Sequence, residues 1–428
     1  MTLLQPAAQL GRMRGEPAAW TVRASLASAC LGWMFDAMDL QLFTLILFPS
    51  VSELIGSTDP ARVAYTAGLV LACKLVAWGV GGIAFGVVAD RIGRARTMVV
   101  TILIYSIFTG ASGLAQSWWQ LAILQALAGI GIGGEWAAGA ALVAETWPER
   151  TRARALVVMQ MSFAFGFFLA AVLNLIVGPI GWRFVLAAGV APALITLFIR
   201  RFVPEPERWV AARRQRGASD TVTATFLAIF APGMRRRTIV GVLIAAAMMI
   251  GAWGGATLLP TWIHQLVGPG NAAFAVKATS QCFMLANVGA VVGYLGLIWL
   301  TDAIGRRWSY FVMALGCAAA TLFMFGQIRT IDALLWFMPV YGFFAVGGFG
   351  TFAAYLPELF PTRIRATGQG FCWNMARALT AAGPLMAGTL VGALGSIPAA
   401  GAAVTAVYAV GMAAIWFGPE TRGVPLQD

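Results

Sequence analysis

The chain has 428 residues, of which 60% are hydrophobic and only 11% are charged, and its formal net charge is +12. Soluble domains carry about 25% charged residues, so this composition excludes an ordinary water-soluble protein. The five cysteines are scattered through apolar stretches, which argues against both a disulfide framework and a cysteine metal site.

Apolar segments long enough to cross a bilayer, at about 20 residues each, recur along the chain. We expect twelve, at residues 22–49, 63–89, 97–115, 119–144, 155–177, 182–202, 238–265, 274–301, 309–327, 331–356, 367–394 and 397–417. No cleavable signal is visible before them, so the first segment is expected to direct its own insertion. The predicted organisation is a tail (1–21), a six-helix bundle (22–203), a linker (204–237), a second six-helix bundle (238–417) and a second tail (418–428).

The basic residues predict the orientation of these segments. Most of the 29 Lys and Arg residues lie in the tails, in the linker and in the loops that share their side of the membrane. The opposite loops keep only Arg62, Arg183, Lys277 and Arg329. This distribution follows the positive-inside rule and predicts an inner-membrane protein with both termini in the cytoplasm. It also explains the net charge without nucleic acid as a partner.

The two halves of the chain repeat one another. Asp90-Arg-Ile-Gly93-Arg94 aligns with Asp302-Ala-Ile-Gly305-Arg306, and the stretch 145–153 aligns with 358–366. The offsets, 212 and 213 residues, are close to half the chain length. A duplicated helical unit of this kind predicts two pseudo-symmetric bundles with a substrate site between them near the membrane midplane.

The loop at residues 86–96 resembles the signature between helices two and three of the major facilitator superfamily, and its degenerate copy lies between helices eight and nine. The resemblance covers the whole chain and implies the twelve-helix major facilitator fold. An acid at a helix end, followed by a Gly turn and arginines, can clip that helix to its neighbour's terminus. A loop that only follows the positive-inside rule would explain the arginines but not Asp90, Gly93 and their second copy. We therefore expect a gating role for Asp90, Arg91, Gly93, Arg94, Glu145, Arg150, Asp302, Arg306, Glu358 and Arg363.

Two further stretches, 32–41 and 356–377, resemble proton symporters of organic anions: the sialic-acid and lactate-type permeases and, more loosely, the aromatic-acid permeases. That resemblance implies uptake of a carboxylate driven by the proton gradient, without a cofactor, by a protein that commonly works as a monomer. Segment seven lacks the Gln-Gln pair of sugar porters. Segments four and five lack the Arg and the Gly-Pro motif of drug antiporters.

Four charged residues fall deep inside predicted segments: Asp36, Lys74, Glu135 and Arg377. At ~1.5 Å per helical residue they lie about 15 to 24 Å from the inner ends of their helices. Because a charge at the bilayer centre costs roughly 2.5–3.5 kcal/mol, each is a candidate functional residue.

The acids are candidates for proton coupling. Asp36 and Asp39 are three residues apart on one helical face, and two carboxylates so close do not readily ionise together. Glu135 is the next candidate. Two alternatives remain open: one aspartate forms a fixed ion pair with Lys74, or it contacts the substrate directly.

Arg377 offers a bidentate fork for a substrate carboxylate, although a permanent pair with Glu135 is the alternative and Lys74 is a second candidate anchor. Neutral binding candidates are Gln41, Asn287, Gln369 and Asn374. Four tryptophans could stack on a substrate ring or simply pack: Trp33, Trp136, Trp253 and Trp373.

The sequence therefore predicts a proton-coupled transporter that imports a small organic anion, a monocarboxylate or an aromatic acid, by alternating access. The alternatives are an exporter or antiporter of the same fold, or a sugar-type porter. The Gly-rich run 129–134 lies inside an apolar helix, so close helix packing explains it better than a nucleotide. A membrane-embedded enzyme or sensor is disfavoured, since the chain shows no catalytic motif.

Overall fold

The computed structural model describes residues 19–191, 199, 202–215, 221–268, 271–380 and 390–427, and these residues form helices joined by short turns. In chain order the main helices are α2 (Ala19–Ile55), α3 (Pro60–Ile92), α4 (Arg94–Ser112), α5 (Trp118–Thr146), α6 (Arg152–Val177), α7 (Trp182–Ala188), α9 (Glu207–Arg214), α10 (Val222–Leu227), α11 (Arg235–Val267), α12 (Ala272–Gln327), α13 (Ile331–Ala345), α14 (Gly350–Tyr355), α15 (Arg365–Thr380) and α17 (Ile397–Ala414). The tail at residues 1–18 lies outside the described residues.

The predicted twelve-helix, all-α architecture is confirmed. Within the described residues nine helices are long and apolar enough to span a membrane. This number is smaller because α12 contains segments eight and nine, which meet at a non-helical Gly305. Segments six and eleven include residues 192–198 and 381–389, outside the described part of the chain.

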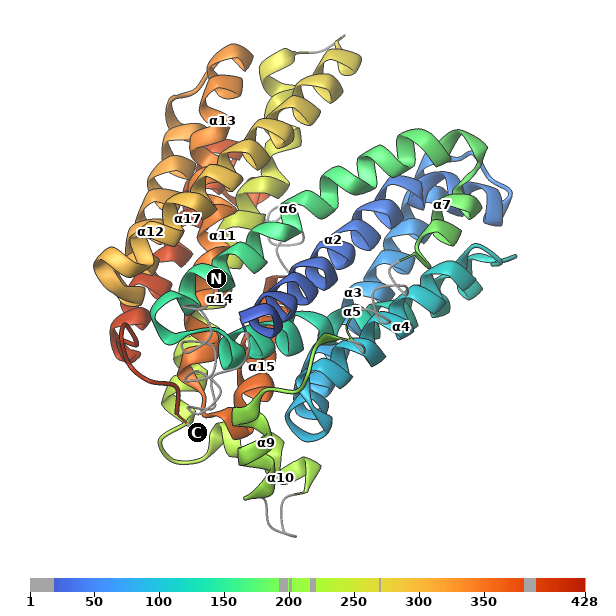
Figure 1. Ribbon diagram of the computed structural model, residues 1–428. Coiled ribbons are helices and arrows are strands. Elements are labelled where there is room, and N and C mark those ends of the chain that lie inside the picture. The colour runs from blue at the N-terminus through green and yellow to red at the C-terminus, as the bar shows by residue number, and fades with distance from the viewer. Residues whose placement is uncertain are drawn as a thin grey trace, which may run out of the picture.

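The helices form two groups (Figure 1). One group contains α2 to α7 and the other α11 to α17, while α9 and α10 lie below both. We call the side of α9 and α10 the linker end. Toward the opposite end the ribbons of the two groups diverge.

Two seams join the groups. At the first seam, α15 packs against α3 and α5, and at the second seam, α6 packs against α12 and α14. At the first seam a Cβ added to Gly86 would lie 2.8 Å from the Ala366 carbonyl oxygen. The helices therefore approach to backbone contact there, and this fixes the residues on α3, α5 and α15 relative to one another.

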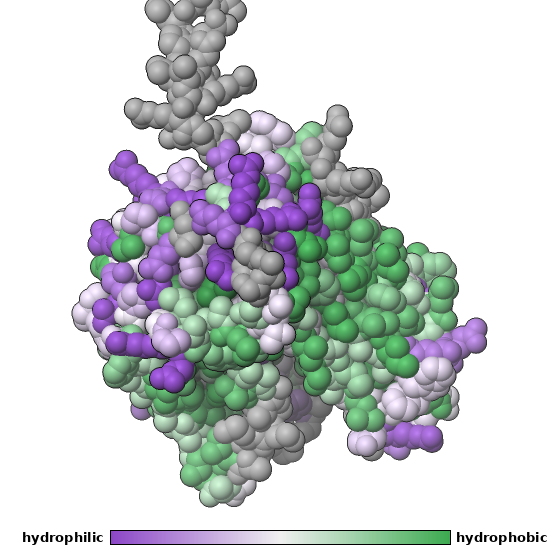
Figure 2. Space-filling model, turned by 90° about the horizontal axis from the view of Figure 1, so that it is seen from below, coloured by the Kyte–Doolittle hydropathy of each residue, from purple (hydrophilic) through white to green (hydrophobic). Residues whose placement is uncertain are grey.

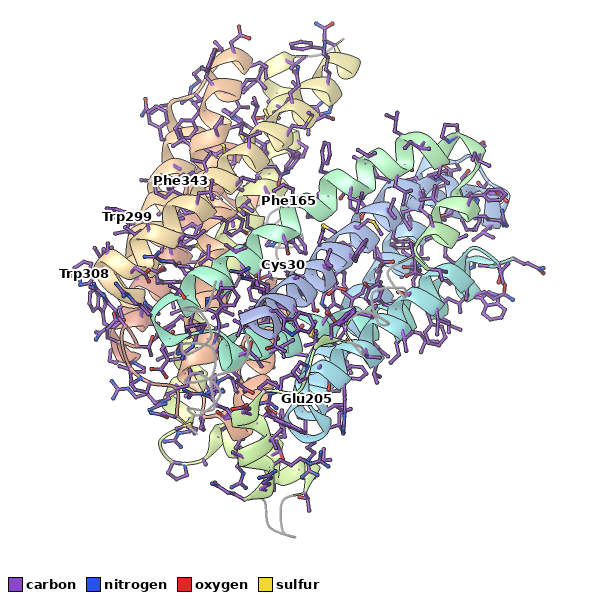
Figure 3. The ribbon with its side chains drawn as sticks, in the orientation of Figure 1. Cys30, Phe165, Glu205, Trp299, Trp308 and Phe343 are labelled. Carbon is purple, nitrogen blue, oxygen red and sulfur yellow. The ribbon has the colours of Figure 1, made fainter. Side chains whose placement is uncertain are left out.

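Large apolar side chains cover much of the surface. Trp299 and Leu175, for example, are 70% and 78% exposed, and Figure 3 shows Trp299 at the outer side of the molecule. Figure 2 shows the linker end, where hydrophilic side chains gather beside broad hydrophobic areas. Exposed apolar sides with a hydrophilic end suit a protein whose sides are solvated by lipid.

Candidate transport site and gate

Small residues on α5 bring it against α3. A Cβ added to Gly129 would lie 2.4 Å from the Lys74 carbonyl oxygen, and one added to Gly133 would lie 2.2 Å from that of Trp78. The Gly-rich run is thus a helix-packing surface, as expected. It also sets the depth and direction of Lys74 and Trp78.

Lys74 forms a closed polar network with Asp39. Its ammonium nitrogen lies 2.7 Å from Asp39 Oδ2 and donates to Gln125 Oε1 at 2.8 Å. The other Asp39 oxygen accepts from the Thr109 hydroxyl, and Gln125 donates in turn to Ser112. Both charged groups are buried. The sequence left this pairing open as an alternative, and the geometry selects Asp39 as the aspartate that pairs.

Asp36, one turn away on α2, has no such partner. It is fully buried, and neither carboxylate oxygen accepts a hydrogen bond from any described residue. The groups close enough to act on it electrostatically are Glu135, Asp39, Arg377 and Lys74. A buried carboxyl without hydrogen-bond donors is costly as an anion, and this sets Asp36 apart from Asp39.

Glu135 on α5 is held on one side only. Its Oε2 accepts from the Thr101 hydroxyl at 2.7 Å, while Oε1 has no partner among the described residues. Glu135 packs against α2, since a Cβ on Gly32 would lie 2.0 Å from its Oε1.

Arg377 on α15 reaches across the first seam. Its guanidinium carbon lies 3.8 Å from the centroid of the Trp78 ring and 5.8 Å from that of Trp373. Within the described residues it forms no ion pair, so the alternative of a permanent pair with Glu135 is not observed. A half-buried cation that rests on aromatic faces retains its hydrogen-bond donors for an incoming anion.

Three of the four singled-out tryptophans gather at this level. Trp136 on α5 and Trp373 on α15 stack with centroids 4.4 Å apart and an interplanar angle of 15°. Trp33 on α2 lies 6.3 Å from Trp373. Trp136 donates to Gln160 at 2.9 Å, whereas the indole N–H groups of Trp33 and Trp373 have no acceptor among the described residues. Trp253 lies apart and is 53% exposed.

The neutral candidates lie in different places. Gln369 is buried and donates to the Ala137 carbonyl oxygen across the first seam. Asn374 is buried, donates to Gly370 in its own helix, and keeps an unpartnered Oδ1. Gln41 is half-buried on α2. Asn287 is exposed and donates to Phe283 of its own helix, so it lies away from the other candidates.

At the linker end, Asp90 closes the first seam. Its carboxylate accepts from the backbone N–H groups of Ala366 and Thr367, at 3.2 and 2.8 Å, and from the Thr367 hydroxyl. These donors lie in the first turn of α15, so an acid in the last turn of α3 caps a helix of the other group. The predicted clip between a helix end and a neighbouring terminus is present.

Arginines extend this closure. Arg94 pairs bidentately with Glu145, at 3.0 and 2.8 Å, and lies 3.0 Å from Asp90. Glu145 also pairs with Arg365 of α15 at 2.8 Å. Arg365 and the Thr362 N–H in addition donate to the Gln427 carbonyl oxygen, which ties the C-terminal segment to the same cluster.

The repeated motif forms a second, different cluster. Arg306 pairs bidentately with Glu358, at 3.0 Å for both contacts, as Arg94 does with Glu145. Asp302, however, pairs with the side chain of Arg154 instead of capping a helix. The two copies of the motif thus share the arginine–glutamate pair, but their aspartates make different contacts.

Several residues of this layer were not among those singled out from the sequence. Arg150 and Arg363 are exposed, whereas the next basic residues along, Arg152 and Arg365, are buried. Arg152 and Arg365 are the first residues of α6 and α15, and the sequence, in which the arginines alternate with other residues, did not indicate which of them point inward. Arg91 is half-buried and donates to Thr225 of α10. Glu205 and Glu420 were also missed: they accept from the first backbone N–H groups after Gly93 and Gly305.

Gly93 and Gly305 themselves have φ of 122° and 85°, which favours glycine at both sharp turns.

The Major Facilitator Superfamily model matches residues 29–382. The chain belongs to the Major Facilitator Superfamily. It is a membrane transporter and not an enzyme.

Relatives narrow the kind of superfamily member. The chain is 32% identical over 405 residues, with 93% of this chain and 90% of the relative covered, to a probable 4-methylmuconolactone transporter of Cupriavidus pinatubonensis. It is 29% identical over 375 residues, covering 86% and 88%, to a cis,cis-muconate transport protein of Acinetobacter baylyi. These relatives confirm the resemblance to organic-anion permeases of the superfamily.

A solved structure shows the same fold. The proton:xylose symporter XylE bound to 6-bromo-6-deoxy-D-glucose aligns with a TM-score of 0.78 at 18% identity, covering 95% of this chain and 97% of that one.

Proposed function

We propose that this superfamily member is a proton-coupled symporter that takes up a small organic anion, a monocarboxylate or an aromatic acid, by alternating access. The observation that carries the proposal is Arg377. It is a half-buried cation, it reaches across the seam between the two groups, and among the described residues it has no acidic partner. An unpaired cation in such a position favours the binding of an anion.

The substrate class follows from the surroundings of Arg377. The guanidinium offers a bidentate contact to a carboxylate, and the nearby Trp136–Trp373 stack offers flat aromatic surface. A planar acid can use both. A neutral sugar would leave the guanidinium unpaired, which disfavours the sugar-type alternative. The similarity to a cis,cis-muconate transport protein agrees with an organic acid as substrate.

Coupling to protons is assigned to Asp36. Asp39 is committed to Lys74 and Thr109, and loss of its charge would leave a buried ammonium unpaired. Asp36 forms no ion pair or hydrogen bond through its carboxylate among the described residues, and it lies within electrostatic range of Arg377. Protonation of Asp36 and binding of an anion at Arg377 therefore influence one another, which is the requirement for symport.

The gate is the pair of clusters at the linker end, with Asp90, Arg94, Glu145, Arg306 and Glu358 at their centre. By the positive-inside rule that end faces the cytoplasm of an inner-membrane protein. In the present conformation the clusters hold the groups together there, and their ion pairs must break for the opposite conformation to form.

The proposal is tested by binding a radiolabelled aromatic carboxylate, for example benzoate, to purified protein. Arg377→Lys keeps the charge but loses the fork, so it should weaken binding by about tenfold, and Arg377→Ala should weaken it by a further factor of about ten or more. Melting temperatures of the variants show whether they remain folded.

Lys74 provides the matched comparison, because it is a second buried cation but already has an acidic partner. Lys74→Met should lower the melting temperature more than it affects binding by folded protein. A folded Arg377→Ala variant with wild-type affinity for every carboxylate that binds the wild type would remove Arg377 as the anchor.

A further inference from the structure

A hollow with a volume of about 550 Å³ lies at the linker end, between α9 and the first turn of α4. Figure 3 labels Glu205, one of its lining residues. The complete lining is Arg96, Glu205, Trp209, Val210, Arg213 and Arg214. None of these residues belongs to the transport site or to the ion pairs across the seams.

The charge of this hollow is positive and uncompensated. The side chains of Arg96, Arg213 and Arg214 form no ion pair with any residue that the structure describes. The single acid, Glu205, is already engaged, because it accepts from the backbone N–H groups of Arg94 and Arg96 at 2.7 and 3.0 Å. One carboxylate cannot neutralise three guanidinium groups around a single concave surface. The remaining positive charge attracts an anion such as a phosphate.

The wall of the hollow is held in place. Trp209 is 2% exposed, and its indole N–H donates to the Asp90 carbonyl oxygen at 2.8 Å. The guanidinium of Arg213 lies 5.2 Å from the centroid of the Trp209 ring. Because Trp209 fixes α9 to the end of α3, the arginines of α9 are positioned before any ligand arrives.

The hollow opens beside a lipid-facing surface. Arg96 lies in the first turn of α4, and Val100 and Ile107 follow on the same helical face at spacings of four and eleven residues. Val100 and Ile107 are 38% and 55% exposed, as apolar side chains are when they face acyl chains. A basic site that continues into an apolar stripe matches a phospholipid, with the headgroup at the arginines and the chain along α4.

We propose that this hollow binds the phosphate headgroup of an anionic phospholipid. The guanidinium groups of Arg96, Arg213 and Arg214 contact the phosphate, and an acyl chain lies along Val100 and Ile107. Basic pockets at the cytoplasmic ends of spanning helices are suited to such headgroups. Since α9 also contacts Asp90 through Trp209 and Glu149 through Arg208, the lipid stabilises the arrangement that closes the linker end.

The test uses delipidated full-length protein in neutral detergent, with thermal unfolding measured as phosphatidylglycerol or phosphatidylcholine is added to the micelles. Phosphatidylglycerol should raise the melting temperature in proportion to its mole fraction, and phosphatidylcholine should not. Loss of one arginine should weaken the apparent lipid affinity by about tenfold. The triple variant Arg96→Gln, Arg213→Gln, Arg214→Gln should abolish the shift.

The matched control removes three other exposed arginines from the same end of the molecule: Arg235→Gln, Arg236→Gln and Arg422→Gln. This control should keep the shift, so equal losses in both triples would overturn the site. If the first triple does not fold, Arg213→Gln alone carries the test, and an unchanged shift there has the same meaning. A full shift with inorganic phosphate alone would show that the ligand is a soluble anion, which contradicts the lipid assignment.

Discussion

Asp36 and Asp39 show how two identical side chains one turn apart acquire different chemistry. Asp39 accepts hydrogen bonds from the Lys74 ammonium and the Thr109 hydroxyl, while Asp36 faces no donor among the described residues. An anion without hydrogen-bond donors in an apolar interior is energetically costly, and this cost is the reason for proposing Asp36 as the proton carrier.

Replacing Asp36 should therefore separate binding from energy coupling. Asp36→Asn should abolish accumulation of substrate against its gradient in proteoliposomes, while counterflow exchange, which moves no net proton, should continue at a rate within about tenfold of wild type. Asp39→Asn is the contrasting variant: it leaves Lys74 buried without its partner, which costs roughly 3–5 kcal/mol, so it should lower stability. Gradient-driven accumulation by Asp36→Asn would transfer the coupling role to Glu135.

For individual residues, the sequence predicted how deep the charged side chains lie in the helical bundle but not which side chains they contact. Counting along a helix placed Asp36, Lys74, Glu135 and Arg377 inside the helical bundle, and the first three are buried while Arg377 is half-buried. Their partners come from other helices, such as Thr109 for Asp39 and Trp78 for Arg377. Which of two aspartates meets Lys74 depends on the rotation of α2 against α3, and no spacing within one helix contains that information.

At the level of the helices, the contact between α3 and α5 positions the residues of the candidate site. Gly133 lies against the backbone of Trp78, and the ring of Trp78 supports Arg377. Gly133→Ala should therefore destabilise the protein by about 1–3 kcal/mol through overpacking and should also weaken anion binding. Thermal unfolding and binding of the folded variant measure the two effects.

Gly79 on α3 is the control, because a Cβ there would meet no atom within 4 Å. Gly79→Ala should leave binding unchanged and raise stability by up to about 1 kcal/mol. Equal melting temperatures for Gly133→Ala and wild type would show that the helices can separate at this point without cost.

Among the described residues the existence of the long helices was predictable, whereas the interruption inside segment ten was not. Apolar length alone located the twelve segments, because lipid requires it. Segment ten, in contrast, is divided into α13 and α14 by a short 3-10 turn at Gly347–Phe349. A Gly pair in an apolar run is equally compatible with a continuous packed helix, so only tertiary contacts decide.

For the molecule as a whole, alternating access requires the first seam to open. A cysteine pair at positions 137 and 370 tests this requirement, since a Cβ on Gly370 would lie 3.1 Å from the Ala137 Cβ, which a small relaxation brings into disulfide range. In a background without the native cysteines, oxidation of Ala137→Cys, Gly370→Cys should abolish transport, and reduction should restore it.

The control joins α2 to α5 within one group, where a Cβ on Gly139 would lie 3.4 Å from the Ala29 Cβ. Oxidised Ala29→Cys, Gly139→Cys should still transport, because that contact moves as a rigid unit. Transport by the fully oxidised 137–370 pair would contradict the proposed movement.

The two repeated aspartates hold the two groups of helices together by different interactions: Asp90 caps a helix, whereas Asp302 forms an ion pair. Asp90 is sealed from water and holds a helix end by its backbone, so dissolved ions reach it poorly, whereas the Asp302–Arg154 pair is 23% and 51% exposed and is readily screened. It follows that rising ionic strength loosens one side of the molecule before the other. In the proposed transport cycle, the second seam, which carries the Asp302–Arg154 pair, would therefore loosen before the first seam, with the Asp90 cap as the hinge.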